Sequence, residues 1–558
     1  MNSRDGQLRR WWGSALAVGL ALAACADPKS PAGAKEPSGP KHALYRGYGF
    51  WFQDLTGRFE AAANPKDGPK KYALKRLPDF DPLATDLYQQ TVLMLSSSYP
   101  MTDLSFGVQA SEMLQAVDVI VANSAWVEEF ARNGWLATFD ESVYGPMLKE
   151  AGVEPVRASV PGQRERAIYG IPITRAADFL FYRKGYFKDA AEARRAWLAG
   201  MTGEFPAKVP PFIVSDAQDI HRLFLALVWS IEPDWPRKTA DSFNVNTPAA
   251  RTVLGALRRS VHINARAVAA QRVPFLVDLK RQVNTFTAQP RPFDPAAAEM
   301  GGAAQPTCWL LSTWAQRILV TPWGPPAPLS DVGILPLTAS SEAGRPGVSL
   351  AGGKCLVCSR QVESDDPEAG AARDVIRELV RYLLSEKGQR TLVYDQFEIP
   401  VRAGLLKSLT QEDLAAVFGS RHDWCDYESY CGEVKAGIRP IDAQSQALGR
   451  ETLALLSEIG SAMDDPTRVA MRQNPLTIGQ CMALDVFLCR MLDPSGAHAH
   501  EGVANQDAED KFLEGALDRF QRILEAGQRF IAARPGIADD SSPGAGAKGE
   551  GAGTGEGR

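Results

Sequence analysis

Short strand-like apolar segments alternate with amphipathic segments of helical spacing along this chain, and this alternation constrains the fold more than any other feature. The segment Val117–Ala122 (VDVIVA) has the pattern of a buried strand bounded by polar residues. Asn123 or Ser124 can cap the helix that follows, and Gly134 ends that helix. Other strand patterns lie at 42–50 and 72–77, and other helical patterns at 52–62, 83–95, 372–384 and 508–526. The alternation predicts an α/β fold in which helices cover both faces of a sheet.

Composition excludes several classes of protein. Of the 558 residues, 45% are apolar and 23% charged, which is ordinary for a globular protein and rules out a fibrous or wholly disordered chain. Lys and Arg number 61 against 66 Asp and Glu, a net charge of −5, so no basic excess favours nucleic acid as a partner. The longest apolar run beyond residue 30 is LFLALVW (Leu223–Trp229), far short of the about 20 residues that span a bilayer.

The N-terminal segment has the features of an export signal. Residues 1–24 combine three arginines with a short apolar core, as secretory signals do. The segment ends in Leu-Ala-Ala before Cys25, which resembles a bacterial lipobox, whose cysteine carries the acyl chains that anchor the protein to a membrane. The alternative is a plain signal cleaved nearby, with Cys25 incidental. The Pro-rich residues 25–41 are typical of a tether, and the Gly-rich residues 535–558 of a disordered tail.

The other cysteines give weaker signals. Cys425 and Cys431 flank a short polar loop and could form a disulfide, which export permits. Cys481 and Cys489 lie in a helical pattern that sets them roughly 12 Å apart along the axis, too far to bond each other. A Cys-x-x-Cys pair, Cys355 and Cys358, lies in a strand-like run, where residues three apart point to opposite faces, so a redox or zinc pair is disfavoured.

Enzyme motifs are absent or incomplete. Ser349 lies in GVSLA, close to the Gly-x-Ser-x-Gly turn of serine hydrolases, but the segment that follows has a strand pattern where that turn leads into a helix. His498 and His500 lie in a Gly/Ala-rich segment, where we expect them to be solvated rather than to bind a metal. The chain has no phosphate-binding GxxxxGK[ST] loop and is not expected to hydrolyse ATP.

Five segments carry a resemblance to a known family. The first, VDVIVANSAWVEEFARNGWLATFDE, combines a strand, a turn with a Trp, and a helix closed by Gly-Trp-Leu. The others are IYGIPITRAADFLFYRKGYF (168–187), CWLLSTWAQRIL (308–319), DVGILPL (331–337) and SEKGQRTLVYDQFEIPVRAGLL (385–406). In this order they resemble the extracellular solute-binding proteins (family 1) of ABC importers, chiefly the sugar-binding branch. Lys354 departs from the pattern, since the family often has an aromatic residue after the Gly-Gly pair.

The resemblance implies a two-lobed fold of the periplasmic-binding-protein type (type II). Each lobe would be a sheet flanked by helices, and crossovers near residues 172, 333 and 399 would join the lobes. Residues 42–172 and 334–398 are then expected to form the first lobe, and residues 173–333 and 399–534 the second. The ligand would lie between the lobes, beyond the carboxyl ends of strands.

The resemblance also implies a function without chemistry or cofactor. The chain would capture a polar small molecule, most often a sugar, and deliver it to the membrane subunits of an ABC importer from the outer side of the cytoplasmic membrane or the periplasm. No metal is expected. The alternatives from other classes are a surface lipoprotein that keeps the fold without a transport role, and a serine hydrolase that uses Ser349.

A sugar site needs aromatic platforms and polar side chains, and each candidate also has a structural interpretation. Trp126 can stack on the ligand or pack with Phe130, and Arg175 and Asp178 can bind the ligand or pair with each other. The remaining candidates are Trp314, Tyr48, Trp51, Asn123, Ser124, Gly352, Gly353 and Arg402. Their structural alternatives are core packing for the three aromatic residues, helix capping for Asn123 and Ser124, a tight turn for the two glycines, and a solvated charge for Arg402.

Overall fold

The computed structural model describes residues 40–46, 55–76, 117–160, 166–201, 220–235, 244–260, 309–311, 329–342, 344–396, 398–402, 404–410, 443–474, 476, 478–492 and 506–532. Several predictions concern residues outside these ranges: the leader with Cys25, the tether to residue 39, the helix at 83–95, Tyr48, Trp51, Trp314, Cys425, Cys431, His498, His500 and the tail at 535–558.

A seven-stranded mixed sheet organises the first part of the molecule. Its strands follow the order β2-β1-β3-β12-β6-β5, and β4 also pairs with β12. Strand β1 runs parallel to β2 and β3, whereas β12 runs antiparallel to β3, β4 and β6. The bounds are β1 Lys41–Arg46, β2 Tyr72–Arg76, β3 Val119–Asn123, β4 Leu136–Ala137, β5 Val156–Ala158, β6 Ala167–Pro172 and β12 Lys354–Ser359.

Both faces of this sheet are buried at its centre, which explains why the middle residues of β3 and β12 are apolar on both faces. Alternate residues of β12 point into two separate cores. Leu356 and Cys358 pack in the core on one face of the sheet, and Cys355 and Val357 pack in the core on the other face. The prediction that Cys355 and Cys358 point to opposite faces is thus confirmed. Both thiols are free and buried, and burial raises their pKa, so neither is suited to redox chemistry.

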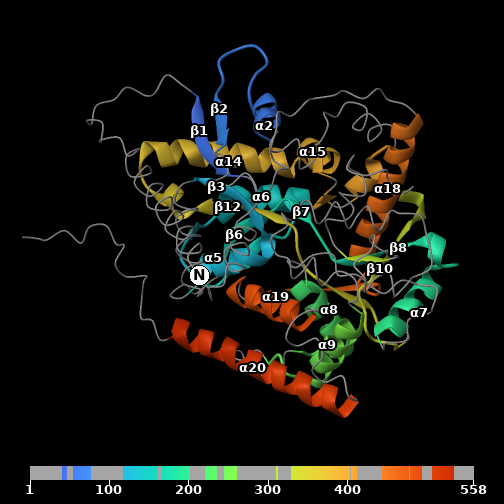
Figure 1. The fold of residues 1–558 in the computed structure, drawn as a ribbon. Helices are drawn as coiled ribbons and strands as arrows, with labels where there is room; N and C mark the ends of the chain where they lie inside the picture. The colour runs from blue at the N-terminus through green and yellow to red at the C-terminus, as the bar shows by residue number, and fades with distance from the viewer. Residues whose placement is uncertain are drawn as a thin grey trace, which may run out of the picture.

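Helices cover the two faces of the large sheet. Helix α14 packs along β1, with α2 and α6 beside it, and Figure 1 shows α14 in yellow next to the blue strands β1 and β2. Helix α5 packs on the opposite face, where Val127 and Phe130 join the core that contains Cys355. The bounds are α2 Leu55–Ala63, α5 Val127–Arg132, α6 Glu141–Ala151, α14 Pro367–Leu384 and α15 Glu386–Gln396, with 3-10 turns η2 Ser124–Trp126 and η5 Arg360–Glu363.

Local sequence signals set the ends of these helices. The side chain of Asp140 accepts a hydrogen bond from the backbone N of Ser142 (2.8 Å) and caps α6, which ends at Gly152 with φ +65°. Asn123 caps η2, and Gly134, with φ +71°, follows the end of α5. The predicted strand at 117–122, its cap and the stop at Gly134 are therefore confirmed, as are helices over 372–384 and 508–526.

The second part of the molecule holds smaller sheets. Strand β8 lies between β10 and β9, β11 pairs in parallel with β14, and the short β13 pairs with β7. The bounds are β7 Thr174–Arg175, β8 Phe179–Arg183, β9 Trp309–Leu311, β10 Val332–Pro336, β11 Gly347–Leu350, β13 Ile399–Pro400 and β14 Val469–Arg472.

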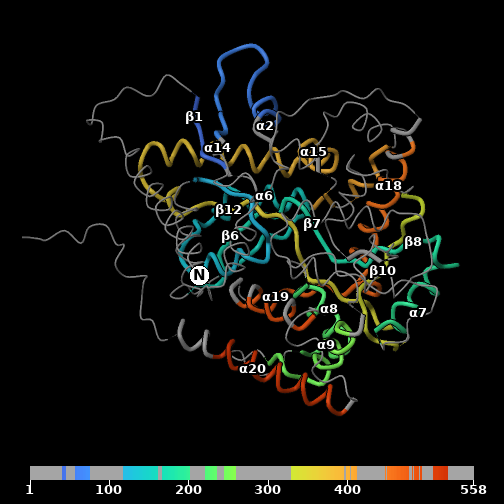
Figure 2. Tube along the Cα trace, in the orientation of Figure 1, coloured from blue at the N-terminus to red at the C-terminus, as the bar shows by residue number. Residues whose placement is uncertain are grey.

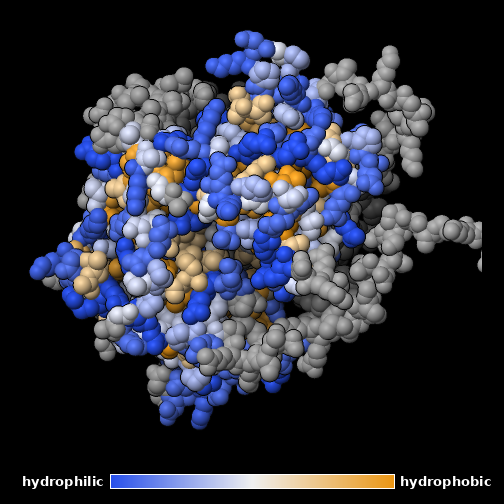
Figure 3. Space-filling view, turned by 180° about the vertical axis from the view of Figure 1, so that it is seen from behind, coloured by the Kyte–Doolittle hydropathy of each residue, from blue (hydrophilic) through white to orange (hydrophobic). Residues whose placement is uncertain are grey.

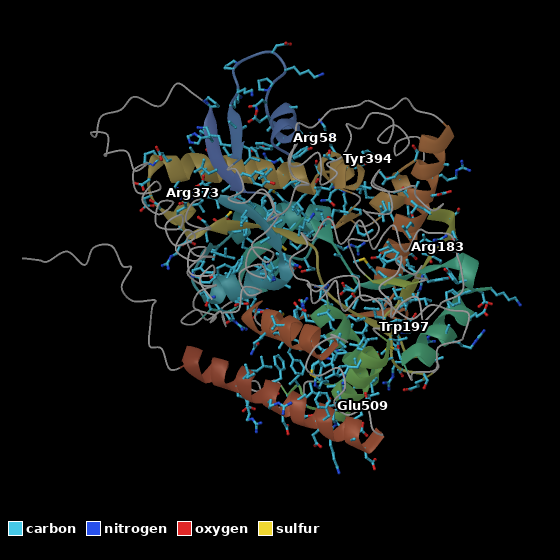
Figure 4. The ribbon with its side chains drawn as sticks, viewed as in Figure 1. Arg58, Arg183, Trp197, Arg373, Tyr394 and Glu509 are labelled. Carbon is cyan, nitrogen blue, oxygen red and sulfur yellow. The ribbon has the colours of Figure 1, made fainter. Side chains whose placement is uncertain are left out.

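Helices again surround these sheets. Helix α8 lies at the centre of this part, with every residue from Ile220 to Ser230 buried, and α7, α9, α19 and α20 contribute to the same core. In Figure 4, Trp197 of α7 and Arg183 of β8 lie in this part, and the Trp197 Nε1 donates to the Thr338 carbonyl (2.7 Å). The bounds are α7 Ala190–Met201, α8 Ile220–Ile231, α9 Pro248–Ser260, α18 Ala443–Met463, α19 Ile478–Leu492 and α20 Gln506–Ala532, with 3-10 turns η3 Lys184–Tyr186, η4 Leu329–Asp331 and η6 Leu405–Ser408.

The chain returns to the large sheet later than the sequence pattern suggested. We expected the return at residue 334, but β10 pairs with β8 over its whole length, and Leu335 packs in the core around α8. Figure 2 traces the chain from β10 back to β12, which enters the large sheet only at Lys354. The apolar strand pattern at 331–337 specifies a strand but does not specify its partner.

A buried ion pair joins α8 to α19. The His221 Nδ1 lies 3.0 and 2.9 Å from the two carboxylate oxygens of Asp485, and the backbone N of His221 donates to Oδ1 at 2.8 Å. Burial acts to lower the pKa of His221, but the Asp485 carboxylate and the nearby Cys481 outweigh it and raise that pKa well above its ordinary value. We therefore expect a charged imidazolium inside the core at neutral pH.

The described surface on one face of the molecule is mostly polar. Figure 3 shows hydrophilic residues over most of the face seen from behind, with hydrophobic residues between them. Within the part of the chain that the structure describes, every helix is too short or too polar to cross a membrane.

Candidate functional site at the crossing segments

Three chain segments meet where the two parts of the molecule join. The first leaves β6 and continues through β7, the second leads from β11 into β12, and the third contains β13. Strand β7 pairs with β13 on one side, as Thr174 with Pro400 and Arg175 with Ile399. On its other side, the backbone N of Ala176 donates to the Gly352 carbonyl at 2.9 Å. The segments thus form a narrow ribbon, with the first crossing in the middle.

Glycine is required where the second crossing passes the first. Gly353 has φ +134°, and a Cβ added there would lie 2.1 Å from the Thr174 carbonyl oxygen, so a side chain would force the segments apart. The carbonyl of Gly353 accepts a hydrogen bond from the backbone N of Ser124 at 2.9 Å. The end of β3, with its polar residues Asn123 and Ser124, is therefore attached to the ribbon.

A buried ion pair spans the ribbon. The Lys354 Nζ lies 2.6 Å from the Glu398 Oε1, with the two side chains 6% and 10% exposed. Lys354 belongs to the second crossing and Glu398 precedes β13 in the third, so the pair connects the two segments that flank the middle one. The backbone N of Lys354 also donates to the Thr174 Oγ1 at 2.9 Å.

Gln389 of α15 connects the ribbon to the part of the molecule that contains the seven-stranded sheet. Its side chain is fully buried, and its Nε2 donates to the carbonyls of Ile173 (3.0 Å) and Leu383 (2.8 Å). Its Oε1 accepts from the backbone N of Val401 at 2.9 Å. One amide thus satisfies backbone groups of the first and third crossings, which would otherwise be buried without partners.

A second buried ion pair lies on the other side of the ribbon. The Arg222 Nη2 lies 2.8 Å from Asp178 Oδ2, its Nε lies 3.0 Å from Oδ1, and the side chains are 11% and 3% exposed. The Arg222 Nη2 also donates to the Leu350 carbonyl at 3.1 Å. Arg222 thereby ties the first turn of α8 to the first and second crossings.

The candidates Arg175 and Asp178 do not pair with each other, so that structural alternative was wrong. Asp178 pairs with Arg222, whereas Arg175 donates to the Pro400 carbonyl (3.1 Å) and pairs with Asp464 (2.6 Å). The reason is geometric: Arg175 lies inside the β7–β13 ladder, and Asp178 lies three residues on, at the start of β8. The Arg175 side chain remains 31% exposed, and it is the more accessible of the two.

The structure gathers several sequence candidates at the ribbon and places others elsewhere. Asn123, Ser124, Arg175, Gly352 and Gly353 come together there. Trp126 is 9% exposed and packs against Phe130, with ring centroids 6.2 Å apart, in the core under α5. Arg402 donates to the Leu384 carbonyl at 3.3 Å, at the end of α14.

Ser349 is placed unlike a hydrolase nucleophile. It is fully buried in strand β11, its Oγ accepts from the backbone N of Asp178 at 2.6 Å, and it donates to the Leu350 carbonyl at 3.2 Å. No strand-to-helix turn follows it, because β11 leads through Ala351–Gly353 into β12. Among the described residues there is also no cluster of three His, Cys, Asp or Glu side chains that could hold a metal.

The residues that organise this site were largely missed by sequence reasoning. Arg222, Lys354, Gln389 and Glu398 were not among the candidates. One sequence feature could have indicated two of them, namely a charged residue directly beside an apolar run. Arg222 precedes LFLALVW, and Lys354 begins KCLVC. A charge that the fold buries in such a position needs an ionic partner, but the sequence does not identify that partner.

Comparisons with known proteins support the fold. No protein-family model matches the chain, and no curated protein matches it in sequence. Among solved structures, it resembles an ABC transporter solute-binding protein from Agrobacterium radiobacter K84 in complex with ribitol. The identity is 14%, the match covers 89% of this chain and 100% of that one, and the TM-score is 0.51.

Two further solved structures are similar at a lower score. Maltose-bound MalE3 of T. maritima matches at 14% identity over 87% of this chain and 99% of its own, with a TM-score of 0.49. A solute-binding protein from Thermotoga lettingae TMO bound with alpha-D-tagatose is 14% identical. The match covers 87% of this chain and 100% of that one, with a TM-score of 0.48.

The likeness to the ribitol complex shows the fold. The chain has the α/β, two-lobed fold of periplasmic binding proteins, with crossing segments between the lobes, as the sequence predicted. The part with the seven-stranded sheet is the first lobe, and the part around α8 is the second.

Proposed function

We propose that this chain is an extracytoplasmic solute-binding lipoprotein that captures a polar small molecule, most favourably a sugar or polyol, between its lobes and delivers it to an ABC importer. The observation that carries the proposal is the two-lobed fold with its three crossing segments. At the level of the fold, it resembles an ABC transporter solute-binding protein that was solved in complex with ribitol. The proposal involves no chemical step and no cofactor.

The proposed site lies near the ribbon, where polar groups of both lobes approach one another. Asn123 and Ser124 come from the carboxyl end of β3, and Arg175 comes from the first crossing. Ligands of α/β sheets bind beyond such strand ends. Hydroxyl groups of a sugar or polyol would pair with these donors and acceptors. Trp126, Trp314, Tyr48, Trp51, Asp178, Gly352, Gly353 and Arg402 remain predicted ligand residues from the family resemblance.

We also propose boundaries for the two lobes. We assign residues 173–333 and 399–534 to the second lobe, and residues 42–172 together with the segment 334–398 to the first. Within that segment, the pairing of β10 with β8 and of β11 with β14 favours a return at 351–354.

A solute screen tests the binding function. In a thermal-shift screen over sugars and polyols, including ribitol and maltose, we expect at least one compound to stabilise the protein, by about 2.7 kcal/mol at 100 times its dissociation constant. Small-angle scattering should then show a smaller radius of gyration with that compound. Arg175→Gln should weaken its binding about tenfold, whereas Arg195→Gln on the exposed side of α7 should not.

The outcome separates the main proposal from its alternative. If no sugar, polyol or other polar solute raises the melting temperature, the surface lipoprotein without a transport role is favoured. A stabilising solute that leaves the radius of gyration unchanged would contradict closure of the lobes over the ligand, but not binding.

The lipid anchor is tested separately. Cys25 is proposed to become the acylated N-terminal residue of the mature protein, because two acyl chains give stable membrane attachment. Cys25→Ser should move the protein from the membrane fraction to the soluble fraction, with the melting temperature unchanged. A variant that fractionates like the parent would show that Cys25 is not the anchor.

A further inference from the structure

The ribbon between the lobes has little backbone pairing of its own. Strands β7 and β13 pair over only two residues each. Beyond the β6–β12 pairing, the first and second crossings are joined by two backbone bonds, from the N of Ile173 to the Lys354 carbonyl (2.8 Å) and from the N of Ala176 to the Gly352 carbonyl (2.9 Å). So short a ladder resists twisting and shearing weakly. Interactions of side chains must therefore provide most of the resistance to sliding of the crossing segments past one another.

Two buried ion pairs are placed to supply this resistance. Lys354 and Glu398 connect the outer segments of the ribbon across the middle one, at 2.6 Å. Arg222 connects the first and second crossings where they enter the second lobe, through Asp178 and the Leu350 carbonyl. Both pairs are charge-assisted bonds between largely buried side chains. In such surroundings these bonds are strong and an unpaired charge is costly.

We propose that these two ion pairs set the angle between the lobes and the stiffness of the hinge. Lys354 and Arg222 are positioning residues: a lobe rotation that slides the crossing segments past one another stretches both pairs and is resisted. The lobes then move only by bending or twisting that preserves the pairs. This inference rests on the two-lobed fold and not on the identity of a solute.

The chain provides a matched control pair. Arg183 at the end of β8 pairs with Asp331 before β10 at 2.6 Å, with side chains 6% and 24% exposed. This ion pair is also largely buried, but it joins two elements of the second lobe and no crossing segment. Its loss should affect local stability without affecting the relative arrangement of the lobes.

The test replaces each pair by uncharged side chains of similar size, which removes the ionic bond without leaving one buried charge unpaired. The variants are Lys354→Met with Glu398→Gln, Asp178→Asn with Arg222→Met, and the control Arg183→Met with Asp331→Asn. Each is made in the full chain and measured without added solute, by small-angle scattering and by hydrogen exchange of the peptides that cover 172–178 and 350–356.

Both hinge variants should show a broader distribution of radii of gyration and about tenfold faster exchange in the crossing segments, while the control matches the parent in both. Parent-like scattering and exchange in either hinge variant would overturn the proposal, and so would equal broadening in the control. If the variant with Asp178→Asn and Arg222→Met does not fold, Arg222→Lys is measured in its place. It keeps the charge but loses the two-pronged contact, and unchanged exchange there would also overturn the proposal.

Discussion

Replacing Arg222 by methionine should lower the free energy of unfolding by about 3–5 kcal/mol, because it leaves the Asp178 carboxylate buried without its partner. That carboxylate is 3% exposed and lies 2.8 Å from the guanidinium in the parent. Methionine fills a similar volume, so the loss would reflect the missing charge rather than a cavity. Denaturant and thermal unfolding followed by tryptophan fluorescence measure the change.

Two controls separate the charge effect from packing. The double variant with Asp178→Asn should recover most of the lost stability, since no charge is then left unpaired. Arg195→Met, at an exposed position of α7, should change stability by less than about 0.5 kcal/mol. A cost below about 1 kcal/mol for Arg222→Met would mean that Asp178 reaches water or another partner when the arginine is gone.

The His221–Asp485 pair should make stability depend on pH. The folded protein holds the imidazole proton to a higher pH than the unfolded chain, because Asp485 raises the pKa of His221 despite its burial. The stabilisation is therefore complete below the unfolded pKa of about 6.5, and it is lost as pH rises through the folded pKa. In that interval the loss should be about 1.4 kcal/mol per pH unit.

A comparison of variants isolates this contribution. As pH rises above about 6.5, the stability difference between the parent and His221→Gln should shrink, measured as unfolding free energy at each pH. Asp485→Asn should abolish the slope that His221 contributes, since the amide carries no charge to hold the proton. A parent–variant difference that stays constant over this range would show that His221 titrates alike in the folded and unfolded chains.

The sequence predicts those features that depend on neighbours along the chain. The run at 119–122 is apolar on both faces, which specifies a doubly buried strand, and Asn123 and Gly134 mark the helix that follows. The spacing of Cys355 and Cys358 within a strand pattern was enough to separate the two thiols. In each case the determining interactions lie within a few residues.

Features that depend on distant partners were not predictable in the same way. The segment 331–337 was correctly predicted to be a strand. Its pairing with β8 rather than with the large sheet depends on tertiary contacts that its own residues do not specify. The partners Arg222 and Asp178 lie 44 residues apart, as do Lys354 and Glu398. A single sequence shows that such charges need partners, and it does not identify them.

The order of strands in the large sheet has a consequence for how the protein is made. Strand β12, on which β3, β4 and β6 all pair, follows the second-lobe strands β8, β10 and β11 in the chain. A nascent chain that ends before Lys354 therefore holds the two halves of the sheet without the strand that joins them. Folding of the first lobe must wait until most of the second lobe has been synthesised. Until then its unpaired strand edges are open to aggregation.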